Sequence, residues 1–227
     1  STGGADEEAQ YEIMIGLLDD EGRIGTPHSL ILEAERHDYM TVIDRWVVAN
    51  TVDWIDQLTR AGHPVPQLSI NISGNSVTDD LFLEFLLDEI TGRGLDTDQL
   101  CFEITETGTI SNMVKAADFV RTLRDIGCSF SIDDFGTGMA SYNYLRELPV
   151  DYVKLDGRFI RNINSDPKDY EMVRSIHSLA KFLGQSTIAE CVENEEVAAT
   201  LRTIGIDYLQ GWAVGKPKPL SEIVDAA

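Results

Sequence analysis

Short apolar runs alternate with longer amphipathic stretches along nearly the whole chain. The short runs have the length of buried strands, and the stretches between them have the 3.6-residue period of helices. We expect strands at Tyr11–Leu17, Gln67–Ile72, Leu100–Ile104, Ser129–Ile132, Tyr152–Leu155, Ser186–Ala189 and Tyr208–Gln210. We expect helices at Thr41–Arg60, Thr78–Arg93, Ile110–Ile126, Met139–Glu147, Lys168–Leu183, Asn194–Ile204 and Leu220–Ala227.

This alternation predicts an α/β fold with a mostly parallel sheet that is covered by helices. Seven or eight strand–helix units in about 220 residues fit a (β/α)8 TIM-like barrel. A doubly wound open sheet is the alternative, although no glycine-rich phosphate loop follows the first predicted strand. The polar residues 1–9 have the character of a linker or a cloning scar, and residues 10–227 are predicted to form one domain.

The chain is strongly acidic. Its 227 residues include 18 Lys plus Arg against 39 Asp plus Glu, which gives a formal net charge of -21. This balance argues against binding of polynucleotides, because phosphate contacts need basic residues, and against contact with an anionic membrane. No apolar run approaches the roughly 18 residues of a membrane-spanning helix. The three cysteines have no paired spacing, which favours reduced thiols and a cytoplasmic location.

Polar side chains stand at the ends of six consecutive predicted strands, where the active sites of parallel barrels are located. They are Asn71, Glu103, the pair Asp133 and Asp134, Lys154, Glu190 and Gln210. A single acid at such a position is most simply a cap for the next helix, but six strand ends of this kind favour a site. Carboxylate and amide oxygens suit Mg²⁺ or Mn²⁺, and two adjacent aspartates would let one carboxylate bridge two ions.

Several residues near these strand ends leave alternatives open. Glu12 begins its predicted strand and is either an exposed residue or, if that strand runs antiparallel to the others, part of the same site. Lys154 forms a structural ion pair with one of the acids, orients a nucleophilic water, or does both. Either Glu190 or Glu193 would accept the proton of that water. The segment Asp19–Gly22 has the composition of a hairpin turn.

Other residues that often carry chemistry have simpler explanations here. Asp134-Phe135-Gly136 spells the metal-binding tripeptide of protein kinases, but no other kinase motif accompanies it. The four histidines match no zinc spacing, and we expect them at the surface or in helix packing. We expect the tryptophans to pack against neighbouring elements rather than to stack on bases; they are Trp46, Trp54 and Trp212.

A series of short motifs occurs in a fixed order along the chain. They are Glu12-Ile13-Met14, the segment from Pro27 to Glu35, Asn71-Ile72-Ser73, Glu103-Ile104-Thr105-Glu106, the segment from Asp133 to Gly138, Lys154-Leu155-Asp156, Glu190-Cys191-Val192-Glu193 and Gln210-Gly211. In this order, from about Tyr11 to Pro217, they resemble the EAL-domain family of bacterial cyclic di-GMP phosphodiesterases. The agreement is specific because many motifs match in sequence order.

The resemblance implies a modified barrel whose first strand is antiparallel, two Mg²⁺ or Mn²⁺ ions, and hydrolysis of cyclic di-GMP to linear 5′-pGpG. The implied metal ligands are Glu12, Asn71, Glu103, Asp133 and Asp134, with Asp133 shared between the ions. The implied catalytic residues are Lys154 and Glu190 with support from Glu193, the implied substrate contacts are Asp156 and Gln210, and Glu106 would brace the loop after Phe135.

The chain departs from the family pattern at three places. Gly16 replaces an arginine that contacts substrate in the family, Cys191 replaces a glycine, and Met139-Ala140-Ser141 replaces Tyr-Ser-Ser. The loss of one charge-assisted hydrogen bond at Gly16 would weaken substrate binding by ~1.5–3 kcal/mol. The alternative to an enzyme is therefore a non-catalytic cyclic di-GMP receptor, and a third hypothesis is a scaffold. The presence of every matched ligand favours the enzyme.

The resemblance also predicts the partners of this domain. Cyclic di-GMP would be its ligand, and a second copy of the chain would form a homodimer with it. Sensor or cyclase domains are expected in the full-length protein, which would then be cytoplasmic or anchored in a membrane by another part. This domain itself is expected to contact neither polynucleotide nor membrane, since its net charge is -21.

Overall fold

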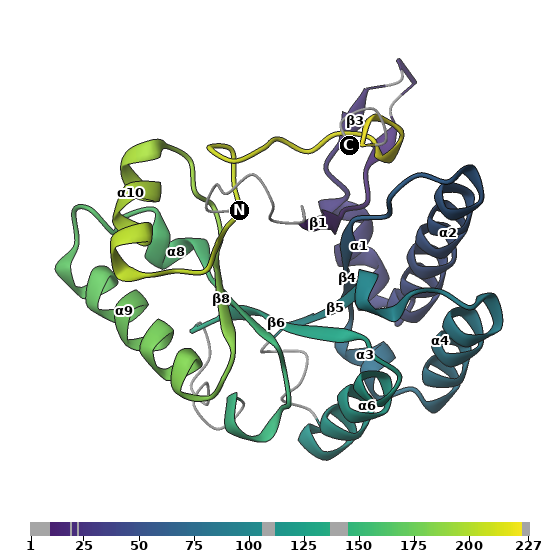
Figure 1. The fold of residues 1–227 in the computed structure, drawn as a ribbon. Coiled ribbons are helices and arrows are strands. Elements are labelled where there is room, and N and C mark those ends of the chain that lie inside the picture. The colour runs from purple at the N-terminus through teal and green to yellow at the C-terminus, as the bar shows by residue number, and fades with distance from the viewer. Residues whose placement is uncertain (1–9, 19, 22, 106–111, 137–144, 224–227) are drawn as a thin grey trace. The chain divides into compact units, whose positions relative to one another are not determined.

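A computed structural model describes residues 10–18, 20–21, 23–105, 112–136 and 145–223. Their contacts separate into two compact units. The N-terminal unit contains the described residues of 10–104 and 108–128, and the C-terminal unit contains those of 129–223 together with Thr105. Figure 1 labels the elements of both units.

Three parallel strands form the sheet of the N-terminal unit. They are β1 (Gln10–Ile13), β4 (Gln67–Ile72) and β5 (Leu100–Thr105), and β4 pairs with both of the others. The register places Glu12 opposite Ser69 and Asn71 opposite Glu103. Because residues two apart in a strand share a face, the side chains of Glu12, Asn71 and Glu103 lie on the same face of this sheet.

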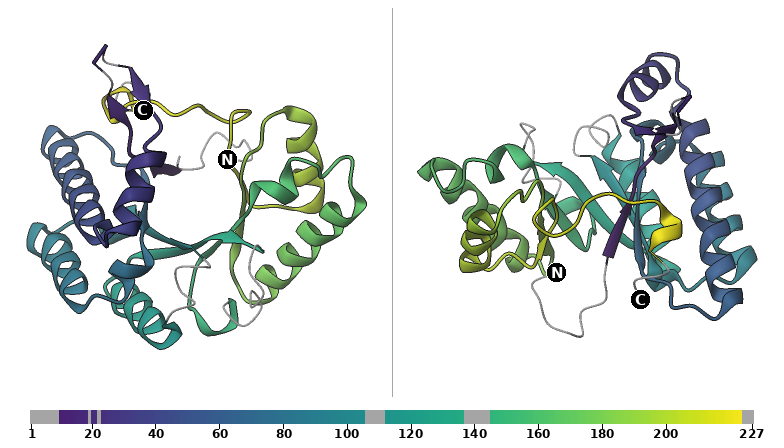
Figure 2. Two further views of the ribbon diagram at one scale, coloured as in Figure 1. Left: turned by 180° about the vertical axis from the view of Figure 1, so that it is seen from behind. Right: turned by 90° about the horizontal axis from the view of Figure 1, so that it is seen from above.

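The helices of the N-terminal unit bury one apolar face each. They are α1 (His28–Arg36), α2 (Met40–Ala61), α3 (Gly74–Val77), α4 (Asp80–Arg93) and α6 (Met113–Asp125), with the 3₁₀ turn η1 (Thr97–Gln99) before β5. Helix α2 packs on α4 and runs alongside β4 (Figures 1 and 2). The core between helices and sheet includes Val48, Val52, Leu68, Ile70, Phe82, Leu86, Leu100, Phe102, Val120 and Leu123. Asp79 caps the start of α4, and Gly94 ends it in the left-handed conformation.

The antiparallel pairing expected at the start of the chain belongs to a hairpin and not to β1. Strands β2 (Leu17–Leu18) and β3 (Ile24–Gly25) pair antiparallel on either side of the predicted turn. The expectation that the first strand is antiparallel is therefore wrong for β1, which runs parallel to β4. The physical reason is the connection: α1 and α2 form a crossover that returns the chain to its starting edge, as parallel neighbours require.

Four parallel strands form the sheet of the C-terminal unit. In spatial order they are β6 (Ser129–Phe135), β7 (Tyr152–Leu155), β8 (Ser186–Ala189) and β9 (Tyr208–Leu209). The register between β6 and β7 shifts between Ile132 and Phe135, which is the mark of a bulge. Because these four strands are parallel, the predicted functional residues at their carboxyl ends lie at the same edge of the sheet.

The helices of the C-terminal unit are α8 (Gly157–Ile160), α9 (Pro167–Phe182) and α10 (Glu195–Ile204), followed by the 3₁₀ turn η2 (Leu220–Glu222). Helix α9 packs against β8 and α8, which Figure 1 labels. Capping residues fix the helix starts, since the side chain of Asp166 accepts a hydrogen bond at α9 and that of Asn194 accepts one at α10. The core includes Phe130, Val153, Leu155, Ile160, Val173, Ile176, Ala189 and Leu201.

The predicted boundaries agree with the structure best for the buried strands. Strands β4, β7 and β8 begin and end at the predicted residues. Most of the helix predicted at Met139–Glu147 lies outside the described residues. The helices in the described part of the chain lack the combination of length and apolar character that a membrane span needs.

Candidate metal and catalytic site

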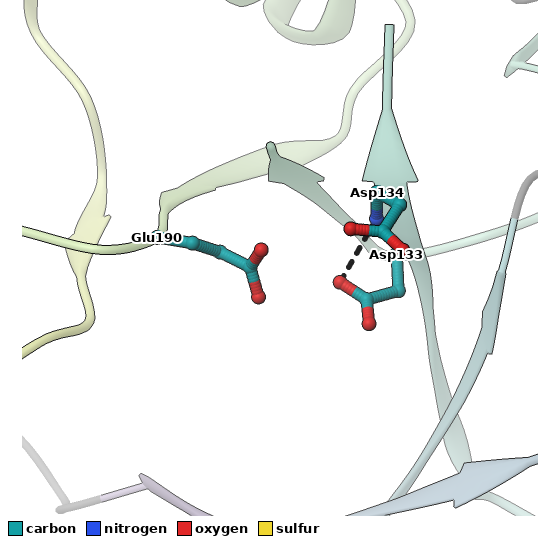
Figure 3. A group of neighbouring side chains, drawn as sticks. All are labelled: Asp133, Asp134 and Glu190. Atoms are coloured by element: carbon teal, nitrogen blue, oxygen red, sulfur yellow. Dashed lines mark hydrogen bonds between the residues drawn. The ribbon is translucent and has the colours of Figure 1, made fainter. Parts of the chain in front are cut away.

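The bulge in β6 presents two neighbouring carboxylates at the end of that strand. Asp133 and Asp134 lie within the register shift, so they are released from regular pairing with β7. Asp134 adopts a left-handed φ of 55°, which aspartate tolerates better than most residues. Its backbone N–H donates a hydrogen bond to Asp133 Oδ1 at 2.9 Å (Figure 3). The bulge therefore keeps the two aspartates side by side.

Lys154 places a buried positive charge among these acids. Its side chain is 1% exposed, and its Nζ lies 2.8 Å from Glu190 Oε1 and 3.3 Å from Asp133 Oδ1. Strand β7 carries Lys154 beside β8, at the end of which Glu190 follows Ala189. The structural ion pair that the sequence left open is confirmed, with two acidic partners. Burial in an environment of low dielectric makes such pairs expensive to break.

The three acids of the C-terminal unit form a cluster with the geometry of a cation site. Asp133, Asp134 and Glu190 each offer a carboxylate oxygen within 4.8 Å of the others, and Figure 3 shows Glu190 facing the two aspartates. Burial, together with the neighbouring Asp133 carboxylate, raises the pKa of Asp134 to about 6. Hard oxygen donors suit Mg²⁺ or Mn²⁺, and a divalent cation would offset the negative charge of the neighbouring carboxylates. The residues therefore fit the expected ion.

Asp156 connects this cluster to the next helix. Its Oδ1 caps α8 by accepting hydrogen bonds from Arg158 N at 2.7 Å and Arg158 Nε at 3.0 Å. Burial alone would raise the pKa of Asp156, but these bonds and a side-chain hydrogen bond with Asp134 lower it. Asp156 thus caps α8 and also contacts Asp134 of the acid cluster. A contact of Asp156 with substrate stays a prediction.

The loop after Glu190 is held in an unusual backbone conformation. Cys191 has a left-handed φ of 54°, which explains why a glycine suits this position in the resembled motif. Its Sγ accepts a hydrogen bond from Arg161 Nη2 at 3.3 Å. The exposed Glu193 lies 3.9 Å from Arg161 Nε and is not part of the three-acid cluster. Glu193 thus contacts Arg161, and its catalytic or supporting role stays a prediction.

Backbone hydrogen bonds tie Gln210 to the strand end that carries Glu190. Gln210 N donates to Ala189 O at 2.8 Å, and Gln210 O accepts from Val192 N at 3.0 Å. Gly211 follows with a φ of 148°, and a Cβ there would lie 2.3 Å from Val192 N. Only glycine permits this close approach. The Gln210-Gly211 motif thus fixes the position of the loop that follows Glu190.

The N-terminal unit carries its own row of candidate ligands. Asn71 Nδ2 donates a hydrogen bond to Glu12 Oε1 at 2.7 Å, so these two side chains meet although β1 is parallel to β4. Glu103 stands opposite Asn71 on β5 and is buried, with 2% exposed. Glu12, Asn71 and Glu103 therefore lie in one row on the sheet of the N-terminal unit, and their role as metal ligands stays a prediction.

Asp44 is a site-supporting residue that the sequence analysis missed. This buried carboxylate in α2 accepts hydrogen bonds at Oδ2 from Ser73 N at 2.9 Å, Ser73 Oγ at 2.6 Å and Ser76 Oγ at 2.7 Å. Burial raises its pKa although these bonds oppose the shift. Asp44 thereby anchors the chain two residues after Asn71. Its position on the apolar face of α2, at helical spacing from Val47 and Val48, was the signal available.

The remaining predicted positions have different outcomes. Glu106 and the departure at residues 139–141 lie outside the described residues. At Gly16 a Cβ would lie 2.5 Å from Ile24 Cγ2, so a larger residue needs Ile24 to move. The expectation of packed tryptophans is wrong for Trp46 and Trp212, which are 60% and 70% exposed.

Comparison with known proteins gives the family. The family model described as "EAL domain" matches residues 5–217. The chain is 40% identical to the cyclic di-GMP phosphodiesterase PdeB of Shewanella oneidensis over 219 residues, which cover 96% of this chain and 26% of PdeB. It is 35% identical to the cyclic di-GMP phosphodiesterase PdeF of Escherichia coli over 218 residues, which cover 96% of this chain and 29% of PdeF.

Solved structures agree with this result. The EAL domain of FimX from Pseudomonas aeruginosa, bound to c-di-GMP, matches with a TM-score of 0.86 and 26% identity, over 96% of this chain and 87% of that one. The PaMucR phosphodiesterase in complex with c-di-GMP matches with a TM-score of 0.85 and 26% identity, over 93% of this chain and 86% of that one.

This chain belongs to the EAL-domain family. The predicted fold class, an α/β fold of the TIM-like barrel type, is thereby confirmed. The chain spans about a quarter of the length of PdeB and somewhat more of PdeF. The activity, substrate and partners of the protein are therefore matters for proposal.

Proposed function

We propose that this chain hydrolyses one phosphodiester bond of cyclic di-GMP and releases linear 5′-pGpG, with two Mg²⁺ or Mn²⁺ ions. The observation that carries the proposal is the buried Lys154, whose Nζ lies within 3.3 Å of two acids of a three-carboxylate cluster. Curated relatives at 40% and 35% identity are named cyclic di-GMP phosphodiesterases, which supports the choice of substrate.

The proposed ligands of the two ions are the acid cluster and the row of the N-terminal unit, namely Asp133, Asp134, Glu12, Asn71 and Glu103. Asp133 is proposed as the shared ligand. When bound, the ions supply Lewis-acid stabilisation of the charge that develops on the phosphoryl oxygens. The contact of Asn71 Nδ2 with Glu12 Oε1 at 2.7 Å supports their joint role, because it orients both oxygen-bearing side chains.

In the proposed reaction, the oxygen of a water forms a bond to phosphorus while the bond from phosphorus to the 3′-oxygen breaks. Glu190 accepts the proton of that water, and the departing 3′-oxygen takes up a proton from solvent. Lys154 holds Glu190 in position through the 2.8 Å contact and balances its charge. Glu193 supports this pair, while Asp156 and Gln210 contact the substrate and Glu106 braces the adjacent loop.

The direct test is product analysis with purified protein, cyclic di-GMP and Mg²⁺ or Mn²⁺. Glu190→Gln should lower turnover by about 10²- to 10⁴-fold, because the proton acceptor is lost. Glu171→Gln is the matched control, since this exposed acid of the same unit pairs only with Arg174 among the contacts described. Binding without any product at high enzyme concentration would contradict the proposal. Wild-type turnover by Glu12→Ala would show that the ligand assignment is wrong.

A cyclic di-GMP receptor without turnover is the second candidate, and Gly16 favours it. The missing arginine removes one cation that would hold the anionic ligand, and Ile24 fills the space where its Cβ would lie. Gly16→Arg combined with Ile24→Ala should tighten binding by about 10- to 150-fold relative to Ile24→Ala alone, if one charge-assisted hydrogen bond is restored. Unchanged affinity would mean that another cation already serves the ligand.

The proposal extends to the partners and the location of the protein. Sensor or cyclase domains in the full-length protein agree with the small share of PdeB and PdeF that this chain covers, and a homodimer is proposed from the family resemblance. A cytoplasmic location agrees with three free cysteine thiols. Binding of polynucleotides or membranes by this domain is not expected at a net charge of -21.

A further inference from the structure

Trp212 is an aromatic residue in an unexpected environment. Its side chain is 70% exposed, in a stretch from Trp212 to Pro219 in which every residue is exposed. Because most of this ring is in contact with water, burial in the core does not account for a tryptophan at this position. Lys216 Nζ lies 5.3 Å from the centroid of this ring, in a cation–π arrangement. The pair therefore presents an aromatic face and a positive charge together.

Backbone contacts fix this pair beside the strand end that carries Glu190. Before Trp212, Gln210 N donates to Ala189 O at 2.8 Å, and after it, Ala213 N donates to Val192 O at 2.9 Å. Both bonds join the segment to residues within two positions of Glu190. Val214 N and Gly215 N donate to Gly211 O at 2.9 Å each, which forms the turn that leads to Lys216. All of these residues belong to the C-terminal unit.

We infer that Trp212 and Lys216 form the base-binding part of the substrate site. In this inference, which rests on the proposed function, the indole stacks on a guanine base of cyclic di-GMP. Stacking on an aromatic side chain is tolerant of base identity, because every base has a π face. Trp212 thus favours phosphodiesters that carry a base, and it does not distinguish guanine from adenine. Lys216 supplies positive charge for an anionic ligand in a chain whose net charge is -21.

The test is steady-state hydrolysis of cyclic di-GMP by Trp212→Ala and Trp212→Phe. We expect Trp212→Ala to raise KM by about 5- to 150-fold, with the loss on KM rather than kcat, and Trp212→Phe to restore most of the affinity. Lys216→Met should raise KM and weaken its dependence on salt. Phe182→Ala is the matched control, because Phe182 is 86% exposed in the same unit but ends α9, before β8 begins.

Equilibrium dialysis of cyclic di-GMP in EDTA separates this inference from the proposed function. If the wild-type protein binds in EDTA and still forms no product when Mg²⁺ or Mn²⁺ is restored, the enzyme proposal fails, yet Trp212→Ala should still raise Kd by the same factor. If KM and Kd of Trp212→Ala stay within twofold of wild type, the base-binding role is wrong. A loss in Trp212→Phe as large as that in Trp212→Ala would also contradict stacking, since phenylalanine keeps a π face.

Discussion

Replacing Lys154 with methionine would remove the ammonium that lies among the acids of the C-terminal unit. Its Nζ contacts Glu190 Oε1 at 2.8 Å and Asp133 Oδ1 at 3.3 Å, and its side chain is 1% exposed. Breaking a buried ion pair by removal of one partner costs ~3–5 kcal/mol, because the remaining charge is left buried. The two carboxylates keep 15% and 17% of their surface exposed, so water offsets part of this cost. We therefore expect a loss of about 3 kcal/mol.

Thermal unfolding in EDTA measures this loss. For a chain of this size 1 kcal/mol corresponds to ~2–4 °C, so the Tm should fall by roughly 6–12 °C. The matched control is Lys181→Met, since the half-exposed Lys181 contacts Asp207 Oδ1 at 2.9 Å and exposed pairs contribute ~0.2–1 kcal/mol. The control should lower the Tm by less than about 4 °C. A Tm of Lys154→Met within the range of the control would refute the view that a buried ammonium organises the cluster.

Three further changes test the backbone and the pH response. Cys191→Gly should raise the Tm by about 1–4 °C, because glycine adopts the left-handed φ of 54° without strain and this gain exceeds the added entropy of the unfolded chain. A lower Tm of the variant in thermal scans would contradict this expectation. Gly211→Ala should lower both Tm and turnover, since its Cβ would lie 2.3 Å from Val192 N, and unchanged values for both would show that the loop adapts. Burial lowers the pKa of His177, whose Nδ1 lies 2.8 Å from Thr187 Oγ1. The neutral imidazole therefore stabilises the fold above the unfolded pKa of about 6.5, and this contribution is lost as pH falls below that value. Urea denaturation at pH 7.5 and 5.5 should therefore show a smaller loss of stability in His177→Gln than in wild type, and an equal loss would contradict the shift.

The sequence predicts buried strands and strand ends well because their signal is local. Strands β4, β7 and β8 are short runs that contain buried apolar residues, and their predicted limits agree with the structure. The polar residues at those ends, such as Asn71 and Lys154, break an apolar pattern and so are conspicuous. Helices α3 and α8 have four residues each, too few to show a 3.6-residue period.

The features that sequence analysis missed depend on contacts between distant residues. Asp44 stands on the apolar face of α2, but its role is evident only from the hydrogen bonds that Ser73 and Ser76 donate to it. The direction of β1 follows from the crossover, which no local pattern encodes. Trp212 is a large apolar residue of the kind that usually packs in a core. It is exposed because it lies in a turn that begins at Gly211.

Hydrolysis of cyclic di-GMP in H₂¹⁸O tests the central claim most directly. Attack of water on phosphorus predicts linear 5′-pGpG with one ¹⁸O in its 5′-phosphate, formed by the wild-type chain with Mg²⁺ or Mn²⁺ and absent with EDTA. Mass spectrometry of the product reads this label. Cyclic di-GMP that is bound but recovered intact after long incubation at high protein concentration would contradict the account and identify the chain as a receptor.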